Sequence, residues 1–298
     1  MKKRPILLAT LTITLLFSVF LLLVFVLGPA GSTSDLMSVS DKIGVIDMTG
    51  PITSAQELTD DLISFGDNQS IKAVILRIDS PGGAVGPSQE IYQEVLRLQK
   101  KKPVIVSMGS VAASGGYYIA AAAGRLFANP GTITGSIGVI MTFPNYEELM
   151  QKVGVATVVV KSGRFKDMGS ATRSFTEDER KLLQSMIDDV HAQFVEAVSL
   201  GRELPAAEVV KIADGRIFSG RQALALGLID ELGGFQDALR YAADLTGLGD
   251  DPHLVYPEAK RQGLLERIIN MTLGDLLPTM SRAGQTGPQY LWPGVVGL

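Results

Sequence analysis

The chain has 298 residues, of which 46% are hydrophobic and 19% charged, and its formal net charge is −4. This length suffices for one large domain or two small ones with a sizeable buried core. The mild acidity gives no reason to expect a nucleic acid partner, because a phosphate-binding face needs clustered lysine and arginine. The chain has no cysteine and only two histidines, which excludes disulfides and thiolate chemistry and disfavours a zinc site.

The N-terminus carries the strongest compositional signal. A basic start at residues 1–5 precedes an uncharged apolar run from Ile6 to Leu27. About 20 apolar residues cross a bilayer, whereas the apolar region of a cleavable signal peptide has only about 7–15. We therefore expect residues 6–27 to be a transmembrane signal anchor, with a signal peptide cleaved near Ala30 as the alternative. The positive-inside rule keeps residues 1–5 in the cytoplasm and places the remaining chain on the extracytoplasmic side of the cell membrane.

Beyond a linker at residues 28–41, short β-branched runs alternate with helical patterns. Strands are predicted at 42–48, 72–78, 103–108 and 155–163, and helices at 54–65, at 88–100 and directly after Ser114. Thr176 and Glu179 predict a capping box, and the helix that follows has an apolar stripe at Leu183, Met186, Ile187, Val190 and Phe194. This alternation predicts a parallel sheet built from βαβ units, and hence an α/β fold.

The C-terminal part of the chain has two further features. Residues 260–278 are amphipathic, and the final GPQYLWPGVVGL is an apolar tail punctuated by proline and glycine. We expect this tail to lie outside the main core. A neighbouring subunit, the membrane surface and the substrate groove are alternative places for it, and packing against the core is another.

Two loops that follow predicted strands are candidates for chemistry. In RIDSPGGAVG, Gly82 or Gly83 could aim a backbone N–H at a developing oxyanion, or simply form a turn. In VAASGGYYIAAAA, Ser114 lies between a small-residue turn and a helix, where the positive helix end and the Gly115 N–H favour a nucleophile. The alternative is an ordinary helix N-cap. The stretch is not G-x-S-x-G, so the nucleophile elbow of hydrolases is not expected.

A nucleophilic serine needs a base, and the sequence leaves several open. His191 is expected to contact an acidic neighbour on its own helix, and His253 lies in a late loop. A lysine serves only when burial lowers its pKa by several units. Lys161 and Lys166 in VVVKSGRFKDMGSATR are better placed than lysines in plain charged runs, and spacing alone does not decide between them.

Five motifs together resemble the bacterial signal peptide peptidase A family in its short, single-repeat form. They are DSPGG, GSVAASGGYYIA, TGSIGV, KSGRFKDMGS and DGRIFSGRQALALGLIDELGG, in order between about residues 42 and 245. The resemblance implies a protease domain at 42–250, followed by a C-terminal segment at 251–298. It also implies the βαβ-spiral fold of the Clp protease and crotonase superfamily.

The same resemblance implies roles for single residues. Ser114 corresponds to the nucleophile, Lys166 to the general base and Ser136 to a serine that orients the lysine. Gly83 and Gly115 match the oxyanion-hole positions, with Gly82 as the alternative to Gly83. The implied enzyme is a serine endopeptidase with a Ser/Lys dyad and no metal or organic cofactor.

The resemblance further implies a ring-shaped homo-oligomer in which serine and lysine come from neighbouring subunits. The implied substrates are signal-peptide remnants and other short or unfolded peptides. Other functions remain open: a membrane-bound Ser/Lys protease of the SohB type or of the type that partners stomatin-like proteins, a non-proteolytic scaffold, or an acyl-CoA enzyme. For the last, Asp79 is the only acid near the loop glycines.

Overall fold

The computed structural model describes residues 14–19, 41–258 and 288–291, and the chain divides into two compact units, Met1–Ser40 and Asp41–Leu298. Residues 14–19 are helical. Among the described residues, no helix is both long and apolar enough to cross a membrane. Most of the predicted anchor, nearly all of the linker and the amphipathic segment 260–278 lie outside the described residues, so these stay predictions.

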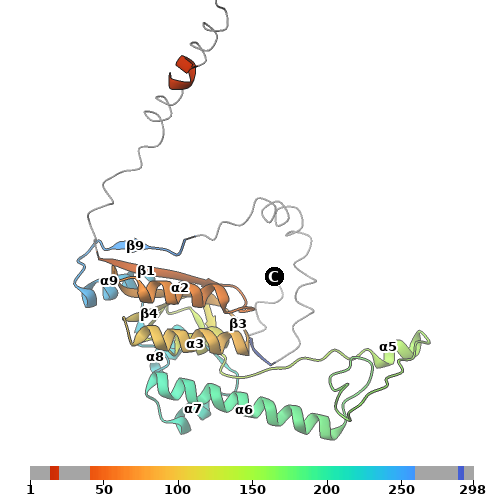
Figure 1. Ribbon diagram of the computed structural model, residues 1–298. Helices are drawn as coiled ribbons and strands as arrows, with labels where there is room; N and C mark the ends of the chain where they lie inside the picture. Colours follow the sequence, from red (N-terminus) through yellow and green to blue (C-terminus); the bar gives the residue numbers. More distant parts are fainter. Residues whose placement is uncertain (1–13, 20–40, 259–287, 292–298) are drawn as a thin grey trace, which may run out of the picture. The chain divides into compact units, whose positions relative to one another are not determined.

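In the second unit, strands and helices alternate along the chain (Figure 1). The strands are β1 (Lys42–Thr49), β2 (Ile71–Ser80), β3 (Gly82–Ala84), β4 (Val104–Ala113), β5 (Arg125–Ala128), β6 (Ile133–Gly135), β7 (Ile217–Ser219), β8 (Glu231–Leu232), β9 (His253–Val255) and β10 (Gln289–Leu291). The helices are α2 (Gln56–Asp67), α3 (Val85–Gln99), α4 (Gly115–Ala120), α5 (Glu147–Lys152), α6 (Glu177–Arg202), α7 (Ala206–Ile212), α8 (Gly220–Ala225) and α9 (Phe235–Thr246).

The main sheet confirms the predicted α/β fold with a parallel sheet. Its strands follow the order β7-β6-β4-β2-β1-β9, and β5 pairs with both β4 and β8. All of these pairs are parallel except β6 with β7. The long strand β4 pairs with β5 through residues 105–108 and with β6 through residues 111–113. The sheet therefore changes partners along β4, just before Ser114.

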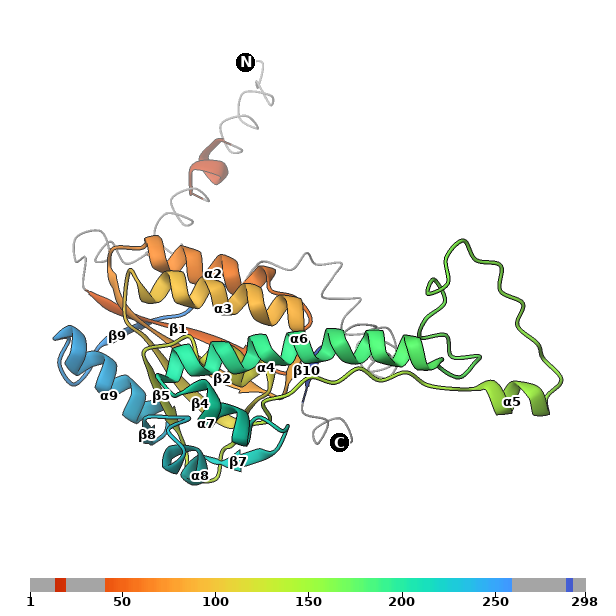
Figure 2. The ribbon, with the colours of Figure 1, turned by 90° about the horizontal axis from the view of Figure 1, so that it is seen from below.

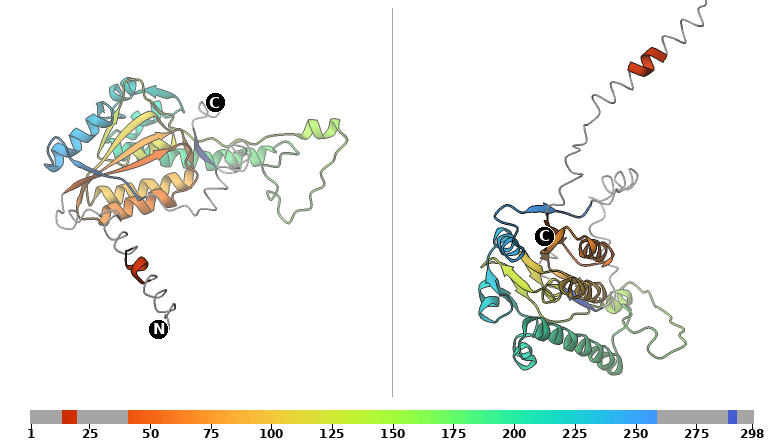
Figure 3. Two further views of the ribbon diagram at one scale, coloured as in Figure 1. Left: turned by 90° about the horizontal axis from the view of Figure 1, so that it is seen from above. Right: turned by 60° about the vertical axis from the view of Figure 1, so that its left-hand side comes forward.

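Helices cover both faces of the sheet. Successive side chains of a strand point to opposite faces, so buried strands such as these place apolar side chains on both faces. Ile43, Ile75 and Phe127 pack on one face with the alanines of α9. Leu76 and Val106 point to the other face, into the larger cluster that also contains residues of α2, α3, α4 and α6. Figures 2 and 3 show α2 and α3 side by side on one side of the sheet and α9 on the other.

Residues 140–176 and the first half of α6 project from the sheet and its covering helices (Figure 2). The predicted strand at 155–163 is wrong, because these residues form no strand and Val160 is 97% exposed. β-branched residues favour strands only where a neighbouring strand and a packing surface exist, and among the described residues no strand pairs with the segment 155–163. The predicted stripe on α6 is buried only at its end, where Phe194 joins the core, whereas Met186 is exposed.

Candidate active site

Ser114 lies in the bend between β4 and α4, in an unusual backbone conformation. Its φ and ψ are 53° and −117°, a positive φ that a residue with a side chain rarely adopts. Its N–H donates to the Gly135 carbonyl over 2.8 Å, and its own carbonyl accepts from the Tyr118 N–H over 2.8 Å. These bonds hold the strained turn. The G-x-S-x-G motif of the hydrolase nucleophile elbow is absent, as the sequence indicates, although the turn at Ser114 is likewise a strained strand-to-helix turn.

The glycines after Ser114 permit a close approach to the neighbouring loops. A Cβ on Gly115 would lie 2.7 Å from the Ser88 Oγ, and one on Gly116 would lie 3.0 Å from the Ser80 carbonyl oxygen. Both distances are shorter than ordinary van der Waals contact, so these positions need glycine. The turn is thereby pressed against the loop that contains Gly82 and Gly83.

In the loop 80–84, the backbone groups of Gly82 and Ala84 bond to Ile52, whereas those of Gly83 face Tyr290 on the opposite edge. The Gly82 N–H donates to the Ser80 Oγ over 3.1 Å. On one edge, Ile52 donates to the Gly82 carbonyl over 2.9 Å and accepts from the Ala84 N–H over 2.8 Å. Because neighbouring residues of a strand face opposite edges, the N–H and carbonyl of Gly83 face the other edge, toward Tyr290 of β10. A Cβ on Gly82 would lie only 2.6 Å from the Gly115 nitrogen. Gly83 and Gly115 thus belong to one cluster of backbone groups.

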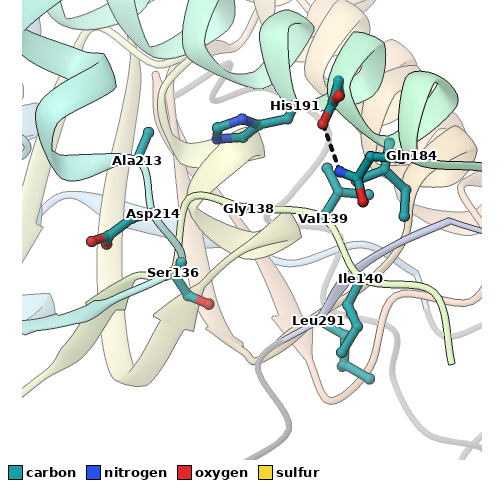
Figure 4. Close-up of a pocket in the computed structure, with 12 residues that line it drawn as sticks. Ser136, Gly138, Val139, Ile140, Gln184, His191, Ala213, Asp214 and Leu291 are labelled. Atoms are coloured by element: carbon teal, nitrogen blue, oxygen red, sulfur yellow. Dashed lines mark hydrogen bonds between the residues drawn. The ribbon is translucent and has the colours of Figure 1, made fainter. Parts of the chain in front are cut away.

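Ser136 follows β6 as Ser114 follows β4. Ala113 and Gly135 are paired in parallel register, so the next residue on each strand emerges at the same edge of the sheet. Ser136 is buried, has a φ of 50°, and donates its N–H to the Arg216 carbonyl over 2.9 Å. It also lines a cavity of about 500 Å³ that extends to α6 and to residues 213–215 (Figure 4). The structure therefore brings the sequence-predicted Ser136 to the same edge as Ser114.

Lys166 is not brought to Ser114 within one chain. It is exposed on the projecting segment, and its N–H donates to the Gly163 carbonyl over 3.1 Å. In the described part of the chain, its side chain makes no hydrogen bond or ion pair. Lys161, the alternative base, donates its Nζ to Asp167 over 2.5 Å and to the Arg164 carbonyl over 3.1 Å. The Lys161 amine is therefore held by partners within its own segment.

A network of ion pairs centred on Arg173 holds the segment around Lys166. The guanidinium donates to Asp167 over 2.8 Å and to the buried Glu179 over 2.5 Å. Hydrogen bonds from Arg173 lower the pKa of Asp167 far below its ordinary value, and those from Arg173 and Thr176 lower the pKa of Glu179 to about 2. Glu179 also completes the predicted capping box with Thr176, which is confirmed. The network links the segment next to Lys166 to the start of α6.

Neither histidine contacts Ser114. His253 lies in β9, paired with Lys42 at the far edge of the sheet. The expected acidic contact of His191 is not seen at its Nε2, which is buried without a hydrogen-bond partner. The neighbouring carboxylates are engaged elsewhere on α6, since Asp188 accepts from Gln184 and Asp189 accepts from Gln193. Figure 4 shows His191 pointing from α6 into the cavity that Ser136 lines.

The C-terminal strand β10 occupies the edge of the loop that carries Gly83. β10 pairs antiparallel with β3, and on its other side Gln289 exchanges two hydrogen bonds of 3.0 Å with Ile140. Tyr290 is fully buried in the core, so the expectation that the tail lies outside the core is wrong for this residue, and the alternative of packing against the core holds there. The sequence carried no signal for this contact, because β10 is far from its partner β3 along the chain and no local pattern links the two. The strand β10 thus lies between β3 on one side and the isolated bridge at Ile140 on the other.

The aromatic residues around Tyr290 were also missed by sequence reasoning. The rings of Tyr118 in α4 and Phe194 in α6 contact the Tyr290 ring, and Tyr92 in α3 contacts Tyr118. In the sequence they look like ordinary core residues, since apolar spacing does not distinguish a core from a pocket lining. Among the described residues, no cluster of three or more histidine or acidic side chains could hold a metal ion.

The model of peptidase family S49 matches residues 96–249, and that of the Clp protease family matches residues 29–132. A protein from Synechocystis sp. that is named as a protease is 46% identical over 215 residues, which cover 72% of this chain and 78% of that protein.

Two further relatives carry more specific names. A protein from Enterococcus faecium named as signal peptide peptidase SppA is 39% identical over 185 residues, 62% of this chain and 54% of the relative. Protease 4 from Haemophilus influenzae is 38% identical over 224 residues, 72% of this chain and 36% of that longer protein. The chain thus spans about half or less of these two relatives. Its parallel α/β fold is consistent with that of Clp protease, and the matches show that the chain is a serine peptidase belonging to peptidase family S49.

Proposed function

We propose that this chain is a membrane-anchored serine endopeptidase that cleaves signal-peptide remnants and other short or unfolded peptides. In this proposal, Ser114 is the nucleophile and Lys166 the general base. The observation that carries it is the meeting of the strained Ser114 turn with the loop of Gly83, at an edge where an extended peptide strand already lies.

The chemistry follows from these groups. A neutral lysine amine takes the proton of the Ser114 hydroxyl while Oγ forms a bond to the peptide carbonyl carbon. The N–H groups of Gly83 and Gly115 donate to the oxygen that becomes negative in the tetrahedral intermediate, an interaction worth about 10²–10³ in rate per donor. The lysine returns the proton to the nitrogen of the leaving amine as the C–N bond breaks. Water, deprotonated by the same amine, then hydrolyses the acyl-enzyme.

The position of Lys166 supports a site shared between neighbouring subunits of a ring. The segment that carries Lys166 projects from the chain's own core, and its apolar side chains are exposed, Val158 at 87% and Val160 at 97%. Exposed apolar patches of this kind are typical of interfaces. Docking against the next subunit would bury them and would withdraw the lysine from water, which favours the neutral amine that a base requires. In this proposal Ser136, which lies at the same sheet edge as Ser114, orients the incoming amine.

Substrate and location rest on separate support. The apolar run at residues 6–27 would hold the enzyme at the extracytoplasmic face of the membrane, where signal-peptide remnants remain after secretion. The relative from Enterococcus faecium is named as a signal peptide peptidase. For the acyl-CoA alternative, Asp79 is unsuited, because its carboxylate accepts the Val111 N–H over 3.1 Å and braces the bend of β4.

The test is cleavage of a fluorogenic apolar peptide by the full chain in detergent, measured between pH 6 and 10. Ser114→Ala and Lys166→Ala should both abolish cleavage without changing the assembled mass in light scattering. Lys161→Ala, five residues away on the same segment, is the matched control and should stay active. The wild-type rate should rise with pH, because only the neutral amine accepts a proton. Full activity of Lys166→Ala would refute the base assignment, and failure of wild type to cleave any peptide would favour a scaffold.

A further inference from the structure

The strand that leads to Ser114 contains a bulge. Met108 and Ala112 of β4, four positions apart, pair with two residues of β2 that are only two positions apart. A single residue of β2, Asp79, therefore lies opposite the three residues 109–111 of β4. Extra residues of this kind bend a strand and re-aim the residues that follow, and bulges are frequent beside active sites. Here the bulge comes directly before the end of β4 that carries Ser114.

The bulge lies where β4 changes partners. Met108 is the last residue paired with β5, and Val111 is the first paired with β6. Residues 109 and 110 fall between these registers and pair with no strand in the described part of the chain. Backbone N–H and carbonyl groups inside a sheet need hydrogen-bond partners. At this bulge, side chains from both sides of β4 provide them.

Asp79 fills the bulge from the side of β2. Its Oδ1 accepts the Val111 N–H over 3.1 Å. A Cβ on Gly109 would lie 2.8 Å from both Cγ and Oδ2 of Asp79, so the carboxylate occupies the space that a side chain at 109 would take. Arg77, two residues earlier on the same face of β2, donates its Nη1 to the Met108 carbonyl over 3.2 Å. The backbone on both sides of the bulge is thus held by side chains of β2.

Two threonines hold the bulge from the side of β6. The Thr132 hydroxyl donates to the Gly109 carbonyl over 2.7 Å, and the Thr134 hydroxyl donates to the Ala112 carbonyl over 2.7 Å. Both threonines are buried. The Thr132 hydroxyl is itself fixed in direction, because it accepts the Asn129 N–H over 3.1 Å. The bulge therefore has one set of bonds toward β2 and another toward β6.

These bonds join the two loops of the candidate active site. Asp79 lies four residues before Gly83, and its partner Val111 lies three residues before Ser114. The Asp79 bond therefore connects the strand that leads to the Gly83 loop with the strand that leads to the Ser114 turn. Thr132 fixes the start of the same short stretch of β4 to the chain that enters β6, where Gly135 accepts the Ser114 N–H over 2.8 Å.

We infer that Asp79 and Thr132 are positioning residues, which set the place of the Ser114 turn relative to the Gly83 loop by holding the bulge at 109–111. This inference rests on the proposed function, in which Ser114 is the nucleophile and Gly83 an oxyanion donor. Both residues act through the backbone of β4 rather than by contact with a substrate. A displacement of about 1 Å between reacting groups costs about 10²-fold in rate, so the two side chains act on kcat.

The experiment measures peptide cleavage by the full chain in detergent, together with the rate at which a fluorophosphonate labels Ser114. Asp79→Ala and Thr132→Val should lower kcat by about 10- to 100-fold, with KM within about threefold of wild type. Labelling should slow in parallel, because it needs the same nucleophile geometry. Asp79→Asn keeps an acceptor oxygen and Thr132→Ser keeps the hydroxyl, so both should stay within about threefold of the wild-type kcat.

A merely structural role would lower the melting temperature and leave the kcat of the folded, assembled enzyme unchanged. Thr246→Val is the matched control, because the Thr246 hydroxyl also donates to a backbone carbonyl over 2.7 Å, at Ala242 of α9. It should keep the wild-type kcat and labelling rate. If Asp79→Ala does not fold, Asp79→Glu answers the same question. It keeps the acceptor but displaces it by one methylene, so kcat should again fall by at least 10-fold.

Two outcomes separate this inference from the protease proposal. Wild-type kcat and labelling in both Thr132→Val and the folded Asp79 variant, Asp79→Ala or Asp79→Glu, would overturn the positioning role. The protease proposal would stand in that case, provided Ser114→Ala is neither labelled nor active. Cleavage or labelling that persisted in Ser114→Ala would instead overturn the proposed nucleophile, and the inference would fall with it.

Discussion

Replacement of Gly83 by alanine tests the oxyanion assignment most sharply. A Cβ at this position would lie 2.1 Å from the Ile52 carbonyl oxygen and 2.6 Å from the Ile52 nitrogen. Ordinary contact needs about 3.4 Å, so the loop would have to move by about 1 Å, and both partner atoms belong to backbone. A displacement of this size, or the loss of one oxyanion donor, costs about 10²–10³ in rate. We therefore expect kcat/KM of Gly83→Ala to fall by about 10²–10³-fold.

The assay is steady-state cleavage of the fluorogenic peptide, combined with thermal unfolding to establish that the variant is folded. Gly131→Ala is the matched control, because a Cβ there meets nothing within 4 Å. It should keep wild-type activity and a wild-type melting curve. A folded Gly83→Ala variant that retained activity within about threefold of wild type would refute the assignment of Gly83 as a donor, since a lost donor has a much larger effect.

Three further predictions concern the helices and the projecting segment. Arg173 keeps the pKa of Glu179 near 2 against an ordinary 4.5, so the Glu179 contribution to stability is fully present above pH 4.5 and is lost as pH falls toward 2. Arg173→Met should reduce this part of the pH dependence in thermal melts, with the hydrogen bonds from Thr176 retaining the remainder, and an unchanged slope would contradict it. In Gly201→Ala the added Cβ would lie 1.8 Å from the Ala121 carbonyl oxygen, so α6 must shift relative to the end of α4. The melting temperature should fall by several degrees. An unchanged or higher melting temperature would contradict this packing. Val160→Asp should leave the fold intact in circular dichroism but reduce both assembly and activity, and a fully assembled, active variant would argue against an interface at this segment.

The sequence was sufficient where local patterns and tertiary structure agree. The buried runs at 42–48 and 72–78 became β1 and β2 with boundaries within two residues, and the capping box at Thr176 formed as predicted. In each case the short-range signal also satisfies the packing of the sheet or the end of the helix. The glycines of loop 80–84 were recognised as special for the same reason, because close approach of backbone leaves room only for glycine.

The sequence was insufficient where a distant contact decides the outcome. The run at 155–163 has strand propensity, but no strand pairs with it in the part of the chain that the structure describes. The burial of Tyr290 depends on contacts with residues far away in the sequence. One of them is the hydrogen bond from its hydroxyl to the carbonyl of Val190, 100 positions earlier. The strained backbone of Ser114 is imposed by partners at Gly135 and Tyr118, so the local sequence gave no motif for it. The ion-pair network of Arg173 joins residues six positions apart on either side, a spacing with no regular structural meaning.

The central claim is that Ser114 and Lys166 from neighbouring subunits form one catalytic site, and subunit mixing tests it directly. Ser114→Ala and Lys166→Ala are prepared separately, shown to be inactive and assembled, then dissociated, mixed in equal amounts and reassembled. Random assembly of a ring with shared sites should restore about a quarter of wild-type activity, because one site in four would combine an intact serine with an intact lysine. A mixture that reassembled but stayed inactive would contradict the shared site, and activity of Lys166→Ala alone would contradict the dyad itself.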